Sequence, residues 1–190
     1  MTDEETKTNE IIKEVNLVLP NVINCNKMFK GCTELTDIDL TIPNATFCYN
    51  MFEGCSNLTD AKVVLYNAIE CESMFYGCSS LINVDLSLPR AKYVGIMFYD
   101  CTSLTDVDLK LPNVEDCGMM FYTCAVENVK LNMPKLSSYS GMFGRTPYVK
   151  TIDVIIPSSI ASDFKSDVLD MLINPSLLTS FKINGVEQID

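Results

Sequence analysis

The fold is decided by the stretch Met28-Phe29-Lys30-Gly31-Cys32-Thr33-Glu34-Leu35 and by its repetition along the chain. The Met-Phe pair returns at intervals of 23, 23, 23, 23 and 22 residues, as Met51-Phe52, Met74-Phe75, Met97-Phe98, Met120-Phe121 and Met142-Phe143. A cysteine lies four residues after the methionine in the first five copies, and Thr146 takes this place in the sixth. A fixed period of about 20 to 50 residues is typical of solenoids and other repeat architectures.

Each copy continues into a short segment of alternating apolar residues. In the first copy these are Ile38, Leu40 and Ile42, and Pro43 follows them. Alternation at period two predicts a strand with one buried face, and proline ends it. Strands that recur every 23 residues are expected to stack as a parallel ladder. The Met-Phe-x-x-Cys segment between strands predicts a short helical or 3₁₀ turn that points Phe and Cys inward.

Both ends of the chain depart from the repeat, as the ends of an open stack must. We expect residues 1–14 to form an acidic N-terminal lead or cap, residues 15–157 the solenoid, and residues 158–190 a C-terminal cap of one helix plus one strand. Inside the solenoid, the fifth coil is one residue shorter at Ala125-Val126. A local change of turn is expected at that link.

The unit Met-Phe-x-Gly-Cys-x-x-Leu resembles the BspA-like leucine-rich repeats of bacterial surface proteins, from about Val15 to Pro157. The resemblance implies an α/β-type, leucine-rich-repeat-like solenoid of about six repeats, with a parallel β ladder, short helical or 3₁₀ turns and a cap at each end. It also implies a role in adhesion or protein interaction. Similar repeats occur in structural proteins of bacteriophages.

Composition narrows the functional classes. The 190 residues include 14 basic and 25 acidic side chains, and a net charge of -11 repels nucleic-acid phosphates. The chain has no histidine, which excludes Ser-His-Asp catalysis and imidazole metal ligands. It has no glycine-rich nucleotide loop, so no cofactor is expected. No apolar run approaches the roughly 18 residues of a membrane span. The acidic start, Met1 to Thr6, does not resemble a signal peptide and favours a cytoplasmic or virion-associated location over the cell surface.

Two cysteine columns run along the predicted stack. One follows the methionine by four residues, and the other, which includes Cys25, Cys48, Cys71 and Cys117, precedes it by three. Stacked coils would bring the thiols of a column close together, so a disulfide or a metal site is one interpretation. The seven-residue spacing within a coil differs from the C-x-x-C knuckle of structural zinc. We therefore favour packing of a small buried residue and expect no metal.

The outward positions of the strands carry the first candidate site. They present the acidic residues Asp37, Asp39, Asp60, Asp85, Asp106 and Asp108, with Lys62 between Asp39 and Asp85. Paired carboxylates suit Ca²⁺ coordination or glycosidase chemistry. Acids at i and i+2 on an exposed strand are also ordinary solvating residues. We expect a solvated face or a partner-binding surface rather than a metal or catalytic centre.

The second candidate site is an aromatic column. Tyr76, Tyr99 and Tyr122 follow Met-Phe in three successive coils. If Met and Phe point inward, these tyrosines are at least partly exposed and stack into a stripe, which suits contact with a protein or a sugar. The alternative is that they only cover the edge of the turn.

These observations predict a non-catalytic module that binds a protein partner or a surface glycan in adhesion or scaffolding. One alternative is an accessory subunit of a bacteriophage virion or another large assembly, docked through an end of the solenoid. Another is a carbohydrate-active enzyme that uses the aspartate face.

Overall fold

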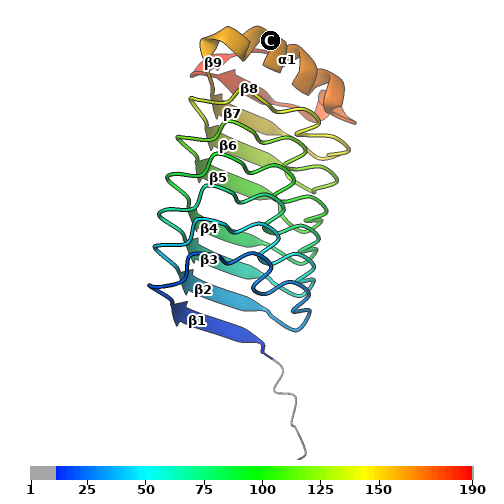
Figure 1. Cartoon of the computed structure of the whole chain (residues 1–190). Helices are drawn as coiled ribbons and strands as arrows, with labels where there is room; N and C mark the ends of the chain where they lie inside the picture. The colour runs from blue at the N-terminus through cyan, green and yellow to red at the C-terminus, as the bar shows by residue number, and fades with distance from the viewer. Residues whose placement is uncertain (1–11, 190) are drawn as a thin grey trace, which may run out of the picture.

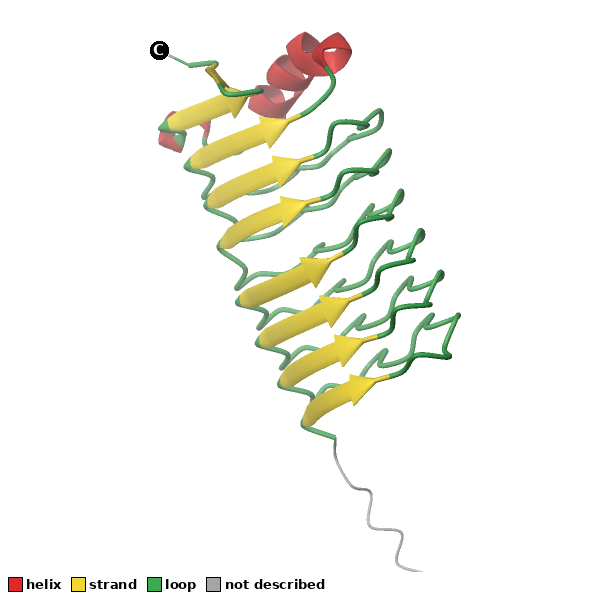
Figure 2. Cartoon of the chain, turned by 90° about the vertical axis from the view of Figure 1, so that its left-hand side faces the viewer, coloured by secondary structure: helices red, strands yellow, loops and turns green. Residues whose placement is uncertain are grey.

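Seven five-residue strands stack in chain order along one side of the molecule, and each connection brings the chain back in the same direction (Figures 1 and 2). The computed structural model describes residues 12–189. The strands are β1 (Glu14–Val18), β2 (Asp37–Thr41), β3 (Asp60–Val64), β4 (Asn83–Ser87), β5 (Asp106–Lys110), β6 (Asn128–Asn132) and β7 (Thr151–Ile155). Paired residues differ by 23 in number, or by 22 between β5 and β6. The predicted parallel solenoid is therefore confirmed, with like residues stacked on like.

The Met-Phe segments form hydrogen-bonded turns rather than a regular helix. Successive backbone N–H groups in each turn donate alternately to a carbonyl oxygen of the next coil and to one of their own coil. The N–H groups of Phe52 and Gly54 donate to the next coil, each at 2.8 Å, and that of Cys55 donates back to Phe52 at 3.1 Å. Left-handed residues interrupt every turn, at Asn50 (φ 56°) and Gly54 (φ 74°) in this coil. The left-handed residues explain why the expected helical or 3₁₀ segment stays a string of turns, since neither helix tolerates them.

A column of phenylalanines fills the core. Neighbouring rings are stacked with centroids 5.1 to 5.7 Å apart, in the order Phe29, Phe52, Phe75, Phe98, Phe121 and Phe143. Five of the six are fully buried, and Phe29 in the first coil is 8% exposed. The stack gives the solenoid one continuous apolar axis.

The cysteines that follow the methionine by four residues do more than fill space. The thiol of Cys55 donates a hydrogen bond to the carbonyl oxygen of Phe29 in the preceding coil, with Sγ···O 3.1 Å. The same bond recurs from Cys78, Cys101 and Cys124. All nine cysteines lie within residues 12–189, and all are free thiols. A small buried side chain with a donor suits this position, and Thr146 fills it in the sixth coil by donating its hydroxyl to Phe143.

We expect a thiol reagent to leave eight cysteines unmodified in the folded protein and to modify all nine after unfolding. Eight thiols are buried, and only Cys32 is partly exposed. Counting labelled thiols by mass spectrometry before and after addition of guanidinium chloride checks this. Fewer than nine reactive thiols in the unfolded, metal-free protein would instead reveal a disulfide.

The C-terminal segment closes the stack. After a 3₁₀ turn at Ser158–Ile160, helix α1 (Ala161–Met171) covers the last coils and buries Phe164 and Val168 (Figure 1). A second 3₁₀ turn (Pro175–Leu177) leads to β8 (Ser180–Ile183), which extends the parallel sheet beside β7. Strand β9 (Val186–Glu187) then pairs antiparallel with β8. At the other end, most of the predicted lead, residues 1–11, lies outside the described residues. Within residues 12–189, no helix is both long and apolar enough to span a membrane.

The strand ladder is interrupted once in the described part of the chain. One sheet has the order β1-β2-β3-β4 and the other β5-β6-β7-β8-β9, so β4 and β5 are unpaired. The inward side chains of β4, Val84 and Leu86, are partly exposed, whereas their equivalents in β3 and β5 are buried. On the turn side the same two coils stay joined, as the bond from Phe75 N–H to Met97 O (2.9 Å) shows.

The shortened link in the fifth coil has a different effect. Residues 124–127 lack the turn that follows the cysteine in the first four coils, so the predicted change of turn at Ala125-Val126 is present. Val126 is fully buried at the place where the first four coils have leucine. Because Val126 restores the packing, β5 and β6 remain paired along their full length.

Candidate functional site

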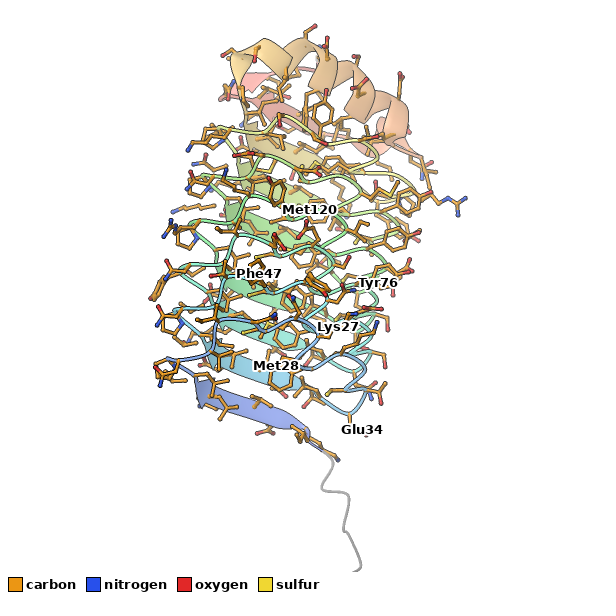
Figure 3. The ribbon with its side chains drawn as sticks, in the orientation of Figure 1. Lys27, Met28, Glu34, Phe47, Tyr76 and Met120 are labelled. Atoms are coloured by element: carbon orange, nitrogen blue, oxygen red, sulfur yellow. The ribbon has the colours of Figure 1, made fainter. Side chains whose placement is uncertain are left out.

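The three tyrosines form a continuous stack along one edge of the solenoid. Tyr76 and Tyr99 have ring centroids 5.0 Å apart with planes 22° apart, and Tyr99 and Tyr122 repeat this spacing at 13°. All three side chains are partly exposed. Figure 3 shows Tyr76 at the right-hand edge, away from the strands. The predicted stripe is therefore present in the structure.

The backbone holds this edge in place. Each tyrosine lies between two left-handed residues, which for Tyr76 are Ser73 and Gly77. The Gly77 N–H donates to Tyr99 O at 2.8 Å, and the Asp100 N–H donates to Tyr122 O at 3.1 Å. Backbone hydrogen bonds between coils thus hold the three tyrosines at equivalent positions, and their side chains take no part in these bonds. The rings are pre-organised, and little freedom remains to be lost on contact.

Charged and small residues finish the stack at both ends. Lys30 and Glu53 occupy the same column in the first two coils and form an ion pair of 2.9 Å. In the sixth coil the Tyr122 ring leans over Gly144, where a Cβ atom would come within 2.5 Å of the ring. The Arg145 guanidinium lies 5.8 Å from the Tyr122 ring centroid, within cation–π range. Removal from water, assisted by Asp100, raises the pKa of the middle tyrosine, Tyr99.

The six predicted aspartates lie on a different surface, the outward face of the strands. Asp37, Asp60 and Asp106 begin β2, β3 and β5, while Asp39, Asp85 and Asp108 occupy the strand centres. Asn83 Nδ2 donates to Asp60 at 2.6 Å, and Asn128 Nδ2 donates to Asp106 at 2.8 Å. The Asn128 bond and one from the Thr105 hydroxyl lower the pKa of Asp106. Asp106 is thereby stabilised as an anion on an open face.

The centre of this face is a column of alternating charge. Lys62 pairs with Asp39 at 2.9 Å, and Lys130 pairs with Asp108 at 3.2 Å. All four side chains are well exposed, so each pair contributes little to stability. Within residues 12–189, no three His, Cys, Asp or Glu side chains are grouped so that they could hold a metal ion.

Shallow hollows mark the strand face. One, of about 620 Å³, extends over β1 to β4 and reaches Thr105 and Asp106. Another, of about 700 Å³, extends from Val84 across β5 to β8. No tyrosine lines either hollow. The two predicted sets of residues therefore form two separate surfaces rather than one site.

Sequence reasoning missed two features. Arg145 escaped notice because the sixth copy is offset by one residue, and nothing in the repeat marks the residue beside Gly144 as a partner of Tyr122. The interruption between β4 and β5 was also not predicted. The sequence signal that could have indicated it is that Asp85 and Asp108 occupy the centres of successive strands, without a lysine in either position.

The fold, with one parallel strand per coil and repeated apolar columns, defines a leucine-rich-repeat solenoid. Its two open surfaces carry side chains suited to contact with other molecules. The chain belongs to the family described as the BspA type leucine-rich repeat region, whose model matches six copies over residues 21–150.

Among solved structures, the chain is similar to a leucine-rich repeat protein from Bacteroides ovatus. The TM-score is 0.62 at 29% sequence identity, and the match covers 90% of this chain but only 42% of the other. The chain thus spans less than half the length of this relative. No curated protein matches the sequence.

Proposed function

We propose that the protein is a non-catalytic module that binds another protein, with the Tyr76, Tyr99 and Tyr122 stack as its main contact surface. The observation that carries this proposal is the stack itself, in which three partly exposed rings are held 5.0 Å apart by the backbone of successive coils. Tyrosine combines a large apolar ring with a polar tip and is enriched at protein interfaces. The family, whose repeats generally mediate protein interactions, supports the same role.

The alternative ligand is a surface glycan. Both faces of the Tyr99 ring are covered by its neighbours, so a sugar would bind through the ring edges and hydroxyl groups of the stack. Binding to a glycan would make the module an adhesin, and binding to a protein would make it a scaffold. The two roles predict different captured ligands, and one set of variants tests both.

Replacing the three tyrosines together by serine is expected to reduce partner binding at least 100-fold and to leave the fold intact. The rings are partly exposed and lie outside the phenylalanine core, so their loss removes contact area without opening a cavity. The measurement is affinity capture from the native source, followed by identification of the captured protein or glycan and titration by calorimetry.

Two control variants sharpen this test. Tyr-to-Phe at the same three positions keeps the rings and should retain most of the affinity. Phe47 and Tyr93 are exposed aromatics in another column, at 38% and 36%, and their replacement by serine should leave binding unchanged. Undiminished binding by the serine triple variant would contradict the proposal.

A second candidate function is an accessory subunit of a virion or another large assembly. The observation that favours it is the exposed apolar side chains of the first strand, β1, where Leu17 is 43% exposed and Val18 is 66% exposed. Replacing both by lysine should then release the protein from the assembly, measured by sedimentation of the native particle. Under the first proposal, this change has no effect on binding through the tyrosines.

A further inference from the structure

The gap between β4 and β5 is a bounded slit. On one side, the Thr102 hydroxyl donates to Ser79 O at 3.3 Å, and on the other, Asn113 Nδ2 donates to Pro89 O at 2.7 Å. Between these two points, the strand edges Asn83–Ser87 and Asp106–Lys110 are unpaired. We call this opening the β4–β5 slit.

Backbone groups at the slit lack the bonds that their equivalents make. The N–H groups of Leu65 and Leu111 each donate to the following coil, at 3.0 and 2.9 Å. In the described part of the chain, Leu88, at the equivalent place, makes no such bond to the coil of β5, and neither does Thr105 to the coil of β4. The partly exposed Val84 and Leu86 belong to the same edge. The slit therefore combines partly exposed apolar side chains with peptide groups that are not bonded to the neighbouring coil.

The charge pattern explains why the sheet opens here. From β2 to β8 the central column reads Asp39, Lys62, Asp85, Asp108, Lys130, Asp153 and Lys182. Charge alternates at every step except from Asp85 to Asp108, which is the step across the slit. Like charges at facing positions of neighbouring strands are destabilising. On the intact side, Asp85 contributes with Asp39 to the raised pKa of Lys62.

Two other pairs of like charges do not open the sheet. Glu14 faces Asp37 across β1 and β2, and Asp37 faces Asp60 across β2 and β3, yet these strands are fully paired. Between β2 and β3, the central residues Asp39 and Lys62 form an ion pair, and Asp60 accepts a hydrogen bond from Asn83. What distinguishes the slit is that its central position has two carboxylates and no cation.

We propose that the β4–β5 slit binds an arginine side chain presented by a protein partner. Its guanidinium lies between Asp85 and Asp108 and supplies the cation missing from the alternating column. Its aliphatic stem lies on the solvent side of the two carboxylates. Arginine suits this place because its planar fork pairs with carboxylates on both sides. The proposal rests on the proposed role in protein binding but concerns a surface separate from the tyrosines.

The test uses N-acetyl-arginine-amide as the probe and N-acetyl-citrulline-amide as its uncharged control. Each is titrated into the whole protein while methyl and amide NMR signals are recorded. The arginine compound should shift the methyl signals of Val84 and Leu86 in a saturable way, and the citrulline compound should bind at least tenfold more weakly. Equal shifts with both compounds, or equally large shifts around Asp37, would overturn the proposal.

Charge variants provide the matched comparison. Asp85→Asn removes one carboxylate without placing a second lysine opposite Lys62, and it should weaken the arginine effect at least threefold. Asp37→Asn makes the same charge change at a paired junction and should leave the effect intact. In Asp85→Asn the amides of Leu88 and Thr105 should also exchange with D₂O at least tenfold more slowly as the strands close. Unchanged exchange, or undiminished binding by Asp85→Asn, would contradict the proposal.

The tyrosine triple variant separates this inference from the proposed function. It should bind N-acetyl-arginine-amide as the wild type does, even when it no longer binds the partner protein. If partner binding requires the tyrosines but the arginine compound has no effect on the wild type, the slit proposal fails alone. If the arginine compound binds and the tyrosine variant still captures the partner, the tyrosine proposal fails alone.

Discussion

Replacing Phe75 by alanine is expected to lower the free energy of unfolding by about 3 to 5 kcal/mol. Phe75 is fully buried, with ring centroids 5.1 Å from Phe52 and 5.7 Å from Phe98. The bond from its own N–H to Met97 O ties its coil to the next, so the cavity cannot readily collapse. Chemical denaturation followed by circular dichroism measures the loss.

Two phenylalanines serve as controls for this prediction. Phe29 is at the end of the stack, has only Phe52 as a ring neighbour and is 8% exposed, so Phe29→Ala should be clearly less destabilising. Phe47 is 38% exposed and outside the stack, and Phe47→Ala should change stability by no more than about 0.5 kcal/mol. Equal losses at the three positions would show that the continuous stack is not what holds the coils together.

Raising the pH from about 9 to 12 is expected to destabilise the fold strongly through the buried thiols. Burial raises the pKa of Cys55 from 9.0 to about 12, and it also raises the pKa values of Cys78, Cys101 and Cys117. A thiol in the unfolded chain loses its proton near pH 9, while the folded thiol keeps it. The stability is therefore fully present below pH 9 and is lost as the pH rises through 12. For Cys55 alone the difference is on the order of 4 kcal/mol.

The measurement is the free energy of unfolding as a function of pH, compared with a variant that cannot titrate in the same way. Thr146 already occupies the column of Cys55, where it is 1% exposed and its hydroxyl donates to Phe143 O within its own coil. The variant Cys55→Thr, Cys78→Thr and Cys101→Thr should thus fold and lose much less stability between pH 9 and 12. Lysine and tyrosine titration is common to both proteins and cancels in the comparison. Parallel pH profiles would refute the thiol explanation.

Much of the fold could be predicted from the repeat because its determinants are local and periodic. The interval between Met51 and Met74 equals the register between β3 and β4, and each strand ends shortly before the place of the repeat's proline. The left-handed residues were harder to predict. Gly31, Gly54 and Gly77 indicate one such place, but Asp100, Thr123 and Arg145 adopt the same conformation without being glycine. The coils bonded on either side hold these residues where propensity alone would not.

The sequence predicts the tyrosines and the aspartates as separate columns of like residues. The charge and pairing of each surface depend on how neighbouring strands and turns contact one another, which a single column does not show. The spacing of Tyr76, Tyr99 and Tyr122 was enough to predict their stacking. The slit was not predicted, because the largest irregularity in the sequence, at Ala125-Val126, suggested that any disruption would lie there. Val126 repairs the packing at that link. Asp85 and Asp108 sit in coils of regular length, and their effect arises only when two strands are placed side by side.

The antiparallel strand β9 covers the edge of the last parallel strand. A parallel ladder has no natural end, since the bare edge of its last strand is a template for the first strand of another molecule. β9 covers this edge at Lys182 and Ile183 and runs in the opposite direction. A second copy that approached this end would meet a two-residue strand of the wrong polarity instead of a continuation of its own repeat. This geometry works against head-to-tail growth into fibres, even though each coil is built to stack on another.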